Sequence, residues 1–207
     1  MIVLLKLFRF LGPTSLFFGT FVVLPPLFLS YFNNALDSQM LNIYLACMVY
    51  SLIILFTLRQ RKFSYTPKDG FVITFLTWVI ISLLASLPFV SSNVGFFDAL
   101  FEAVSGLTTT GSTVISDLSL LPDHILLYRQ LLQWAGGVGL VIVVLAIIPA
   151  VSGGMRVLQA ETSGFADKSF SPRLRETARS LLKFYILITA ACAVSYTHLR
   201  AHETSCD

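Results

Sequence analysis

A cluster of hydroxyl-bearing residues around one glycine is the part of this chain best suited to chemistry. It is the run Thr108-Thr109-Thr110-Gly111-Ser112, which follows a short apolar segment. Carbonyl and hydroxyl oxygens are neutral dipoles that can replace the water around a cation without holding the ion too tightly to leave. Gly111 can adopt backbone angles that other residues avoid, so the carbonyl that follows can turn toward an ion. The run is therefore a candidate cation-coordinating loop.

The same residue types have a simpler explanation. Thr, Gly and Ser are ordinary turn formers, so the run could be a polar turn that caps a short helix at the membrane interface. It is not a phosphate-binding loop, because the Gly-x4-Gly-Lys spacing and a preceding strand are both missing. The residues of the loop alone leave the coordinating loop and the polar turn open.

The composition is that of a membrane protein. The chain has 207 residues, of which 56% are hydrophobic and 12% are charged, and its mean hydropathy is +0.80. A water-soluble fold of this size could not cover so much apolar surface, so membrane lipid is the expected surrounding. The net charge of +3 is small and no basic patch is interleaved with aromatic residues, which argues against a nucleic-acid partner.

Several apolar stretches reach, or nearly reach, the length of about 20 residues that a membrane-spanning helix needs. They are 12–32, 40–58, 71–90, 125–150 and 177–196. Pro25-Pro26 lies inside the first of them and predicts a kink there. The segment 96–107 is too short to cross. We therefore expect an all-α integral membrane fold in which residues 96–113 enter the membrane and return to the same side.

The distribution of positive charge supports this re-entry independently of length. Lys and Arg gather on the cytoplasmic side of membrane proteins. Almost all of them here precede the first span or lie in two later segments, 59–68 and 152–183. Two other loops, 33–39 and 91–124, hold acidic residues and no Lys or Arg. If 96–113 crossed the membrane, the two basic segments would lie on opposite sides. The same pattern places the N-terminus in the cytoplasm.

Further residues could support the loop. Glu102 could meet the positive end of its own short helix, or it could brace the loop through backbone amides. Gly136 and Gly137 let another backbone approach the fourth span closely, either a neighbouring helix or the loop itself. Arg129 could extend to the membrane interface, or it could form a hydrogen bond to the loop.

Three runs of sequence resemble the Trk/Ktr/HKT superfamily of potassium-uptake membrane subunits, and most closely its bacterial TrkH branch. They are FDALFEAVSGLTTTGSTV, LLYRQLLQWAGGVGLVIVVLAIIP and GGMRVLQAETSGFADKSFSPRLRETA, in that order. The resemblance covers about residues 1–195. It implies four tandem repeats of helix, pore helix, filter and helix around one pore, preceded in this branch by an extra transmembrane helix pair. It assigns the parts of this chain as follows: 1–65 to the helix pair, 66–152 to the first repeat, 153–176 to a cytoplasmic loop and 177–196 to the start of a truncated second repeat.

The resemblance also implies a function and a set of site residues. Gly111 takes the role of the key glycine of a selectivity filter, with Thr108, Thr109, Thr110 and Ser112 around it and with Glu102, Gly136 and Gly137 as support. K⁺ is the implied transported ion, bound through the backbone of Thr109, Thr110 and Gly111. No covalent cofactor is implied, and no enzymatic activity is expected. The implied partners are a second copy of the chain and a cytosolic nucleotide-binding regulatory subunit, at the bacterial inner membrane.

The chain departs from the family pattern in two ways. One filter run is present where a pore needs four, and after about Ser195 the apolar pattern gives way to the tail 197–207. We therefore expect a fragment of a pore-forming subunit that ends in a non-native tail. Two other functions stay open. One is a non-conducting membrane scaffold or assembly subunit, and the other is a secondary transporter with broken helices at the membrane midplane.

Overall fold

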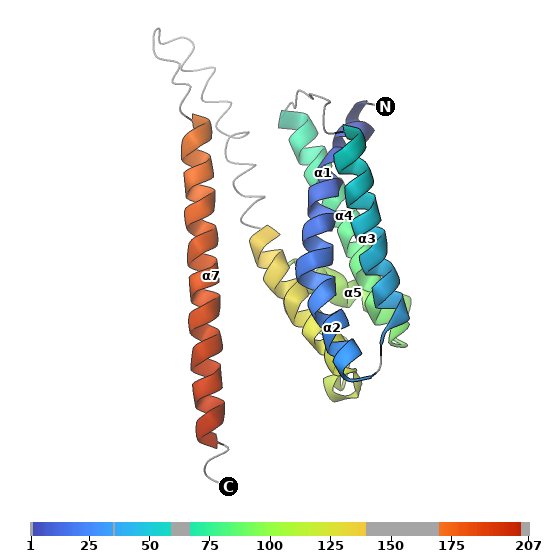
Figure 1. Ribbon diagram of the computed structural model, residues 1–207, viewed down its shortest axis with the longest axis vertical. Helices are drawn as coiled ribbons and strands as arrows, with labels where there is room; N and C mark the ends of the chain where they lie inside the picture. The colour runs from blue at the N-terminus through green and yellow to red at the C-terminus, as the bar shows by residue number, and fades with distance from the viewer. Residues whose placement is uncertain (1, 35, 59–66, 140–169, 204–207) are drawn as a thin grey trace. The chain divides into compact units, whose positions relative to one another are not determined.

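The computed structural model describes residues 2–34, 36–58, 67–139 and 170–203, and the regular elements within these ranges are all helical (Figure 1). The chain divides into two units, residues 1–139 and 140–207, which are described separately. Within the described ranges, four helices are long and apolar enough to cross a membrane: Val3–Phe32, Ser38–Leu58, Asp69–Ser91 and Arg179–His198. The expected all-helical membrane architecture is confirmed.

The first helical run starts earlier in the chain than the sequence pattern predicts. It consists of α1 (Ile2–Phe17), a π-helical turn (Phe18–Val23) and α2 (Leu24–Phe32). Lys6 and Arg9 therefore lie inside α1, whereas we had expected them to precede a helix that starts at residue 12. The wide π turn comes directly before Pro25-Pro26. Proline has no N–H to donate, and its ring crowds the carbonyl four residues earlier, which accounts for irregular helix at this point.

The second helix, α3 (Ser38–Leu58), runs antiparallel to α1 and packs closely against it. Gly12 makes the approach possible, because a Cβ at this position would lie 2.7 Å from Cγ2 of Ile54. The Ser51 hydroxyl donates a hydrogen bond to the Gly12 carbonyl at 3.0 Å. Small residues and hydroxyl bonds of this kind are the usual means of helix association in membranes, where the hydrophobic effect does not drive helices together.

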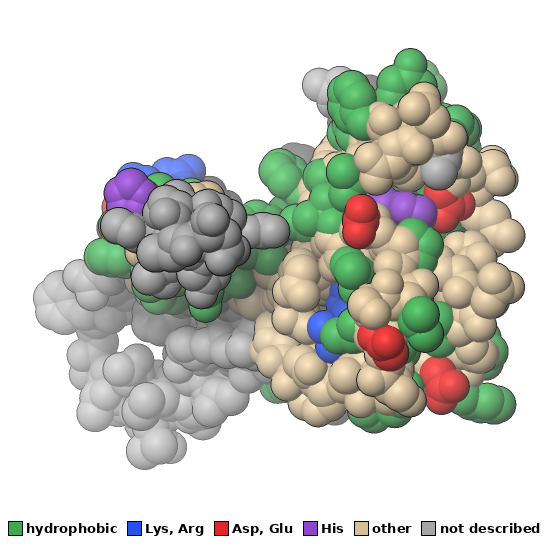
Figure 2. Space-filling model, turned by 90° about the horizontal axis from the view of Figure 1, so that it is seen from below, with side chains coloured by type: hydrophobic (Ala, Val, Ile, Leu, Met, Phe, Trp, Pro, Cys, Tyr) green, Lys and Arg blue, Asp and Glu red, His purple; other side chains and the backbone are tan. Residues whose placement is uncertain are grey.

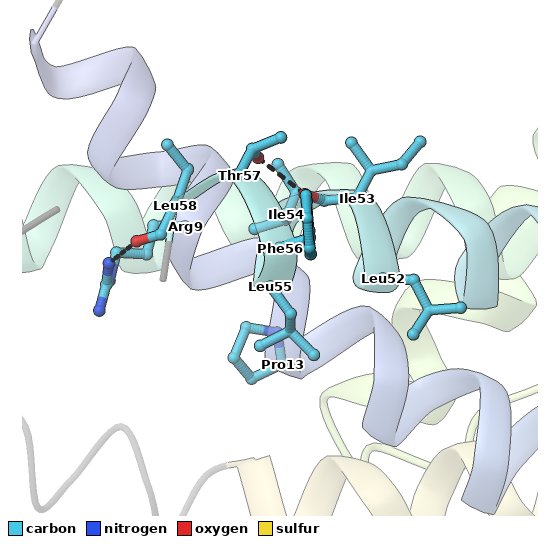
Figure 3. Close-up of a pocket in the computed structure, with 9 residues that line it drawn as sticks. All are labelled: Arg9, Pro13, Leu52, Ile53, Ile54, Leu55, Phe56, Thr57 and Leu58. Carbon is cyan, nitrogen blue, oxygen red and sulfur yellow. Dashed lines mark hydrogen bonds between the residues drawn. The ribbon is translucent and has the colours of Figure 1, made fainter. Parts of the chain in front are cut away.

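Arg9 joins α1 to the C-terminal end of α3. Its guanidinium donates to the carbonyl of Leu58, the last residue of α3, so a positive charge meets the negative end of that helix (Figure 3). Figure 3 also shows the groove between Arg9, Pro13 and residues 52–58, which is lined almost entirely by apolar side chains.

A Lys–Asp ion pair joins helices at one end of unit 1, and a His–Asp contact joins them at the other. At one end, Lys6 Nζ lies 2.8 Å from Asp69 Oδ2, which joins the start of α1 to the start of α4 (Pro67–Ser91). At the other end, Asp37 caps α3 by accepting backbone amides, and its second carboxylate oxygen lies 3.5 Å from Nε2 of His124. His124 belongs to the first turn of a helix that is described over residues 123–139. The α2–α3 loop and the start of this helix therefore lie at the same end.

The remaining helices differ from expectation mainly in their bounds. The short helix α5 (Phe96–Leu107) has the predicted limits. The predicted span 125–150 is described only as far as residue 139, because residues 140–169 lie outside the described ranges. Residues 153–169 of the predicted cytoplasmic loop lie outside them as well. In unit 2, α7 (Phe170–Glu203) extends beyond the predicted 177–196 at both ends.

The close contact between α1 and α3 leads to a stability prediction. We expect Gly12→Val to lower the thermal unfolding midpoint of the detergent-purified protein, because the added side chain must push Ile54 and α3 away. Overpacking of this kind costs about 1–3 kcal/mol. Gly70→Val is the matched control, since no described atom lies within 4 Å of a Cβ placed at that position. Equal losses in the two variants would contradict the packing argument.

Candidate functional site

The site begins with α5, whose two faces differ in residue size. Its buried face carries Ala99, Ala103 and Gly106 at helical spacing, whereas Phe97 on another face is 82% exposed. Asp98 lies in the first turn, where a carboxylate stabilises the positive end of the helix. Twelve residues of α-helix extend about 18 Å, well short of the hydrocarbon thickness of a bilayer.

Residues 108–117, which follow α5, form no helix or strand and include two left-handed residues. Gly111 has φ +75°, and Thr109 has φ +59°. Glycine adopts the first value without the steric cost that a Cβ would bring. The second was not foreseen, because a β-branched residue rarely adopts a positive φ and its type gives no signal of one. Local hydrogen bonds hold this turn, including those from the amides of Thr109 to Gly106 and of Thr110 to Ser105, both at 3.0 Å.

The loop then folds back along α5. The Ser105 hydroxyl donates to the carbonyl of Ser112 at 2.6 Å. The Thr113 hydroxyl and the Val114 amide both donate to Oε1 of Glu102, at 2.5 and 2.9 Å. Glu102 is completely buried. Of the two alternatives for this residue, the structure supports bracing of the loop, including a bond from a backbone amide.

Arg129 joins the same network from the helix at 123–139. Its Nε donates to Oε2 of Glu102 at 2.9 Å, and its Nη2 donates to the carbonyl of Gly111 at 3.2 Å. The side chain is only 7% exposed, so the alternative in which it extends to the membrane interface is wrong and the hydrogen bond to the loop is confirmed. A buried carboxylate needs a partner of opposite charge, and Arg129 supplies it.

Gly136 brings the same helix against the end of α5. A Cβ at this position would lie 2.8 Å from the carbonyl carbon of Leu107 and would collide with its oxygen. Leu107 is the last residue before the threonine run, so the close approach is to the base of the loop. One turn earlier, Leu132 packs against Gly106, with 3.2 Å between its Cβ and a Cβ placed on that glycine. Gly137 is half-buried on the same helix.

The outer side of the loop is rich in exposed oxygen atoms. Residues 108–114 are all exposed, although Ser105, Gly106 and Leu107 immediately before them are buried. Among these exposed residues, the hydroxyls of Thr108 and Thr110 lie 2.8 Å apart. Nowhere in the described ranges do three His, Cys, Asp or Glu side chains gather as metal ligands. Neutral oxygens of this kind suit a weakly held monovalent cation.

Acidic side chains surround this end of the unit, which Figure 2 views directly and where they are drawn in red. Asp117 follows the loop and accepts hydrogen bonds from the hydroxyl and amide of Ser119, which lower the pKa of its carboxyl below the usual value. It therefore keeps its negative charge in mildly acidic surroundings. Fixed negative charges near an entrance raise the local concentration of cations.

Comparison with known proteins places this arrangement in a family. Residues 37–205 match the family model TrkH, which describes cation transport proteins. The chain belongs to the TrkH family. This TrkH-family chain is 35% identical over 192 residues to the Trk system potassium uptake protein TrkH of Salmonella typhimurium, a match that covers 90% of the chain and 40% of the relative. It is 42% identical over 143 residues to TrkH of Halomonas elongata, covering 67% of the chain and 30% of that relative.

A solved structure is similar to the TrkH-family chain as well. The crystal structure of the potassium transporter TrkH from Vibrio parahaemolyticus matches with a TM-score of 0.72 and 31% sequence identity, over 93% of this chain and 39% of that one. The family predicted from the three sequence runs is therefore confirmed. The chain spans about 40% of the length of the first of these relatives.

The contact at Gly136 gives a prediction for the TrkH-family site. We expect Gly136→Ala to destabilise the protein by about 1–3 kcal/mol, because the new methyl group meets backbone that cannot rotate away. Gly139→Ala on the same helix is the control, since its Cβ would lie 3.6 Å from the Trp78 ring, an ordinary contact. Thermal unfolding of both variants in detergent measures the difference. Unchanged stability of Gly136→Ala would show that α5 does not lie against this glycine.

Proposed function

We propose that this chain is the N-terminal part of the pore-forming subunit of a potassium uptake system, and that residues 108–112 form one filter segment. The observation that carries the proposal is the left-handed, oxygen-rich loop that follows a helix too short to cross the membrane. The relatives named as Trk system potassium uptake proteins support the choice of ion.

A membrane restricts what the non-helical backbone of this loop can contact. Non-helical backbone at membrane depth is tolerated only where protein buries it or where it lines water. Residues 108–114 are exposed in this chain, so their exposed surface faces either water or another part of a pore. The C-terminal end of α5 directs its negative dipole toward the same loop, which favours a cation there. Thr109, Thr110 and Gly111 supply the backbone carbonyls, and the Gly111 carbonyl has a second lone pair beside the one that accepts from Arg129.

One filter segment covers a single side of an ion. The remaining sides require further segments, so the proposal places this chain as an extra helix pair and a first repeat within a longer polypeptide. A homodimer in the inner membrane, with the N-terminus and a nucleotide-binding regulatory subunit on the cytoplasmic side, completes the proposed assembly. Segment 153–176 contributes four of the Lys and Arg residues assigned to that side, Arg156, Lys168, Arg173 and Arg175.

The filter assignment predicts the effect of Gly111→Val in the full-length protein. The loop has room for a side chain at this position, but φ +75° is unfavourable for a β-branched residue, so the loop must change shape. We expect Rb⁺ uptake, measured in cells that lack other potassium uptake systems, to fall to background while the protein still reaches the membrane. Gly70→Val serves as the control and should transport normally. Normal uptake by a correctly inserted Gly111→Val protein would exclude the filter role and favour a scaffold.

Re-entry predicts which positions face the same side of the membrane. With the three cysteines of the chain replaced, we expect Ser92→Cys and Leu120→Cys to react with an impermeant maleimide added from the periplasmic side. Lys68→Cys should react only after the cells are opened. Labelling of Ser92→Cys and Leu120→Cys from opposite sides would show that residues 96–113 cross the membrane instead.

A further inference from the structure

The loop is held by two opposite charges that sit behind it rather than on its exposed face. Glu102 is completely buried and Arg129 is 7% exposed. Together they bond three successive parts of the loop, at Gly111, Thr113 and Val114. A neutral amide side chain could brace the backbone at one of these points. A fully charged pair in a membrane protein costs desolvation free energy, which calls for a reason beyond packing.

We propose that Glu102 and Arg129 form a charge-balanced pair that sets how tightly the filter segment holds its cation. This inference rests on the filter assignment proposed above. Arg129 is the charge nearer to the Gly111 carbonyl, because its Nη2 lies 3.2 Å from that oxygen. Glu102 bonds Arg129 Nε at 2.9 Å and contacts the loop further along, at Thr113 and Val114. At Gly111 the positive end of the pair therefore faces the filter segment, and the negative end cancels most of its field. The cation therefore meets neutral oxygens and a nearly neutral background, which allows both binding and release.

Removing one charge at a time should shift cation affinity in opposite directions. In Glu102→Gln the Arg129 guanidinium loses its counter-charge and repels the cation. In Arg129→Gln the Glu102 carboxylate keeps the hydrogen bonds from Thr113 and Val114, which stabilise its ionised form, and it attracts the cation. Glu102→Gln keeps the size of the side chain, and Arg129→Gln keeps an amide donor while it removes the charge. A purely structural pair would give losses of the same sign.

The experiment measures the concentration dependence of Rb⁺ uptake by the full-length protein reconstituted in liposomes. We expect Glu102→Gln to raise the apparent KM at least about tenfold and Arg129→Gln to lower it by a similar factor, the size of effect that a unit charge exerts a few ångströms away in a partly buried site. The double variant should return toward the wild-type KM. Arg129→Lys should keep KM close to wild type but lower the maximal rate, because one ammonium cannot bond Glu102 and Gly111 as the planar guanidinium does.

The His124–Asp37 pair provides a matched control, because it joins the same helix to α3 at side chains that are also nearly buried. Asp37→Asn removes a carboxylate that does not bond the loop, and it should shift KM far less than either single variant of the Glu102–Arg129 pair. Shifts of the same sign in Glu102→Gln and Arg129→Gln, or no shift in either, would overturn the charge-balance inference while leaving the filter assignment intact. Absence of Rb⁺ uptake by the wild-type protein would instead remove the proposed function. If Glu102→Gln does not insert into the membrane, the comparison of Arg129→Gln with the double variant tests the inference. Only Arg129→Gln should then have a lower KM for Rb⁺ than the wild-type protein.

Discussion

The rest of the site depends on the contacts of the Glu102 carboxylate, which are an ion pair and two further hydrogen bonds. It is buried, so every one of its contacts must be made by protein, and the chain supplies its hydrogen-bond donors from two other elements. The loop donates through Thr113 and Val114, and the helix at 123–139 donates through Arg129. An unpaired carboxylate in this position would be very costly. The position of the loop, the register of α5 and the placement of the following helix are consequently determined together.

The glycines of the site follow from the same constraint. Arg129 can reach both Glu102 and the Gly111 carbonyl only if its helix lies close to α5, and Gly136 and Gly106 remove the side chains that would hold the two apart. Gly111 has a different role. Its φ of +75° meets a conformational requirement, and nothing lies within 4 Å of a Cβ added there. Two glycines that allow close packing, Gly106 and Gly136, and one that meets a conformational requirement, Gly111, thus act at neighbouring points of one site.

Much of this fold could be predicted from the sequence because membranes impose simple rules on length and charge. The bounds of α5 and the left-handed Gly111 followed from an apolar segment that was too short and from a glycine after three threonines. The start of α1 could not be predicted in the same way, since Lys6 and Arg9 interrupt the apolar pattern and their partners, Asp69 and the Leu58 carbonyl, are distant in sequence. The positive φ of Thr109 and the choice between alternatives for Arg129 likewise depend on tertiary hydrogen bonds that no local pattern encodes.

The surface of α5 and its loop constrains what must surround them in a complete protein. Phe97 and Phe101 on α5 are largely exposed, and the oxygen-rich residues 108–114 that follow are exposed as well. An aromatic face is stable against lipid or protein, whereas a non-helical backbone at membrane depth is stable only against protein or enclosed water. The same short segment therefore needs an apolar neighbour on one side and a polar, hydrated one on another. A boundary between a protein wall and a water-filled pathway satisfies both requirements.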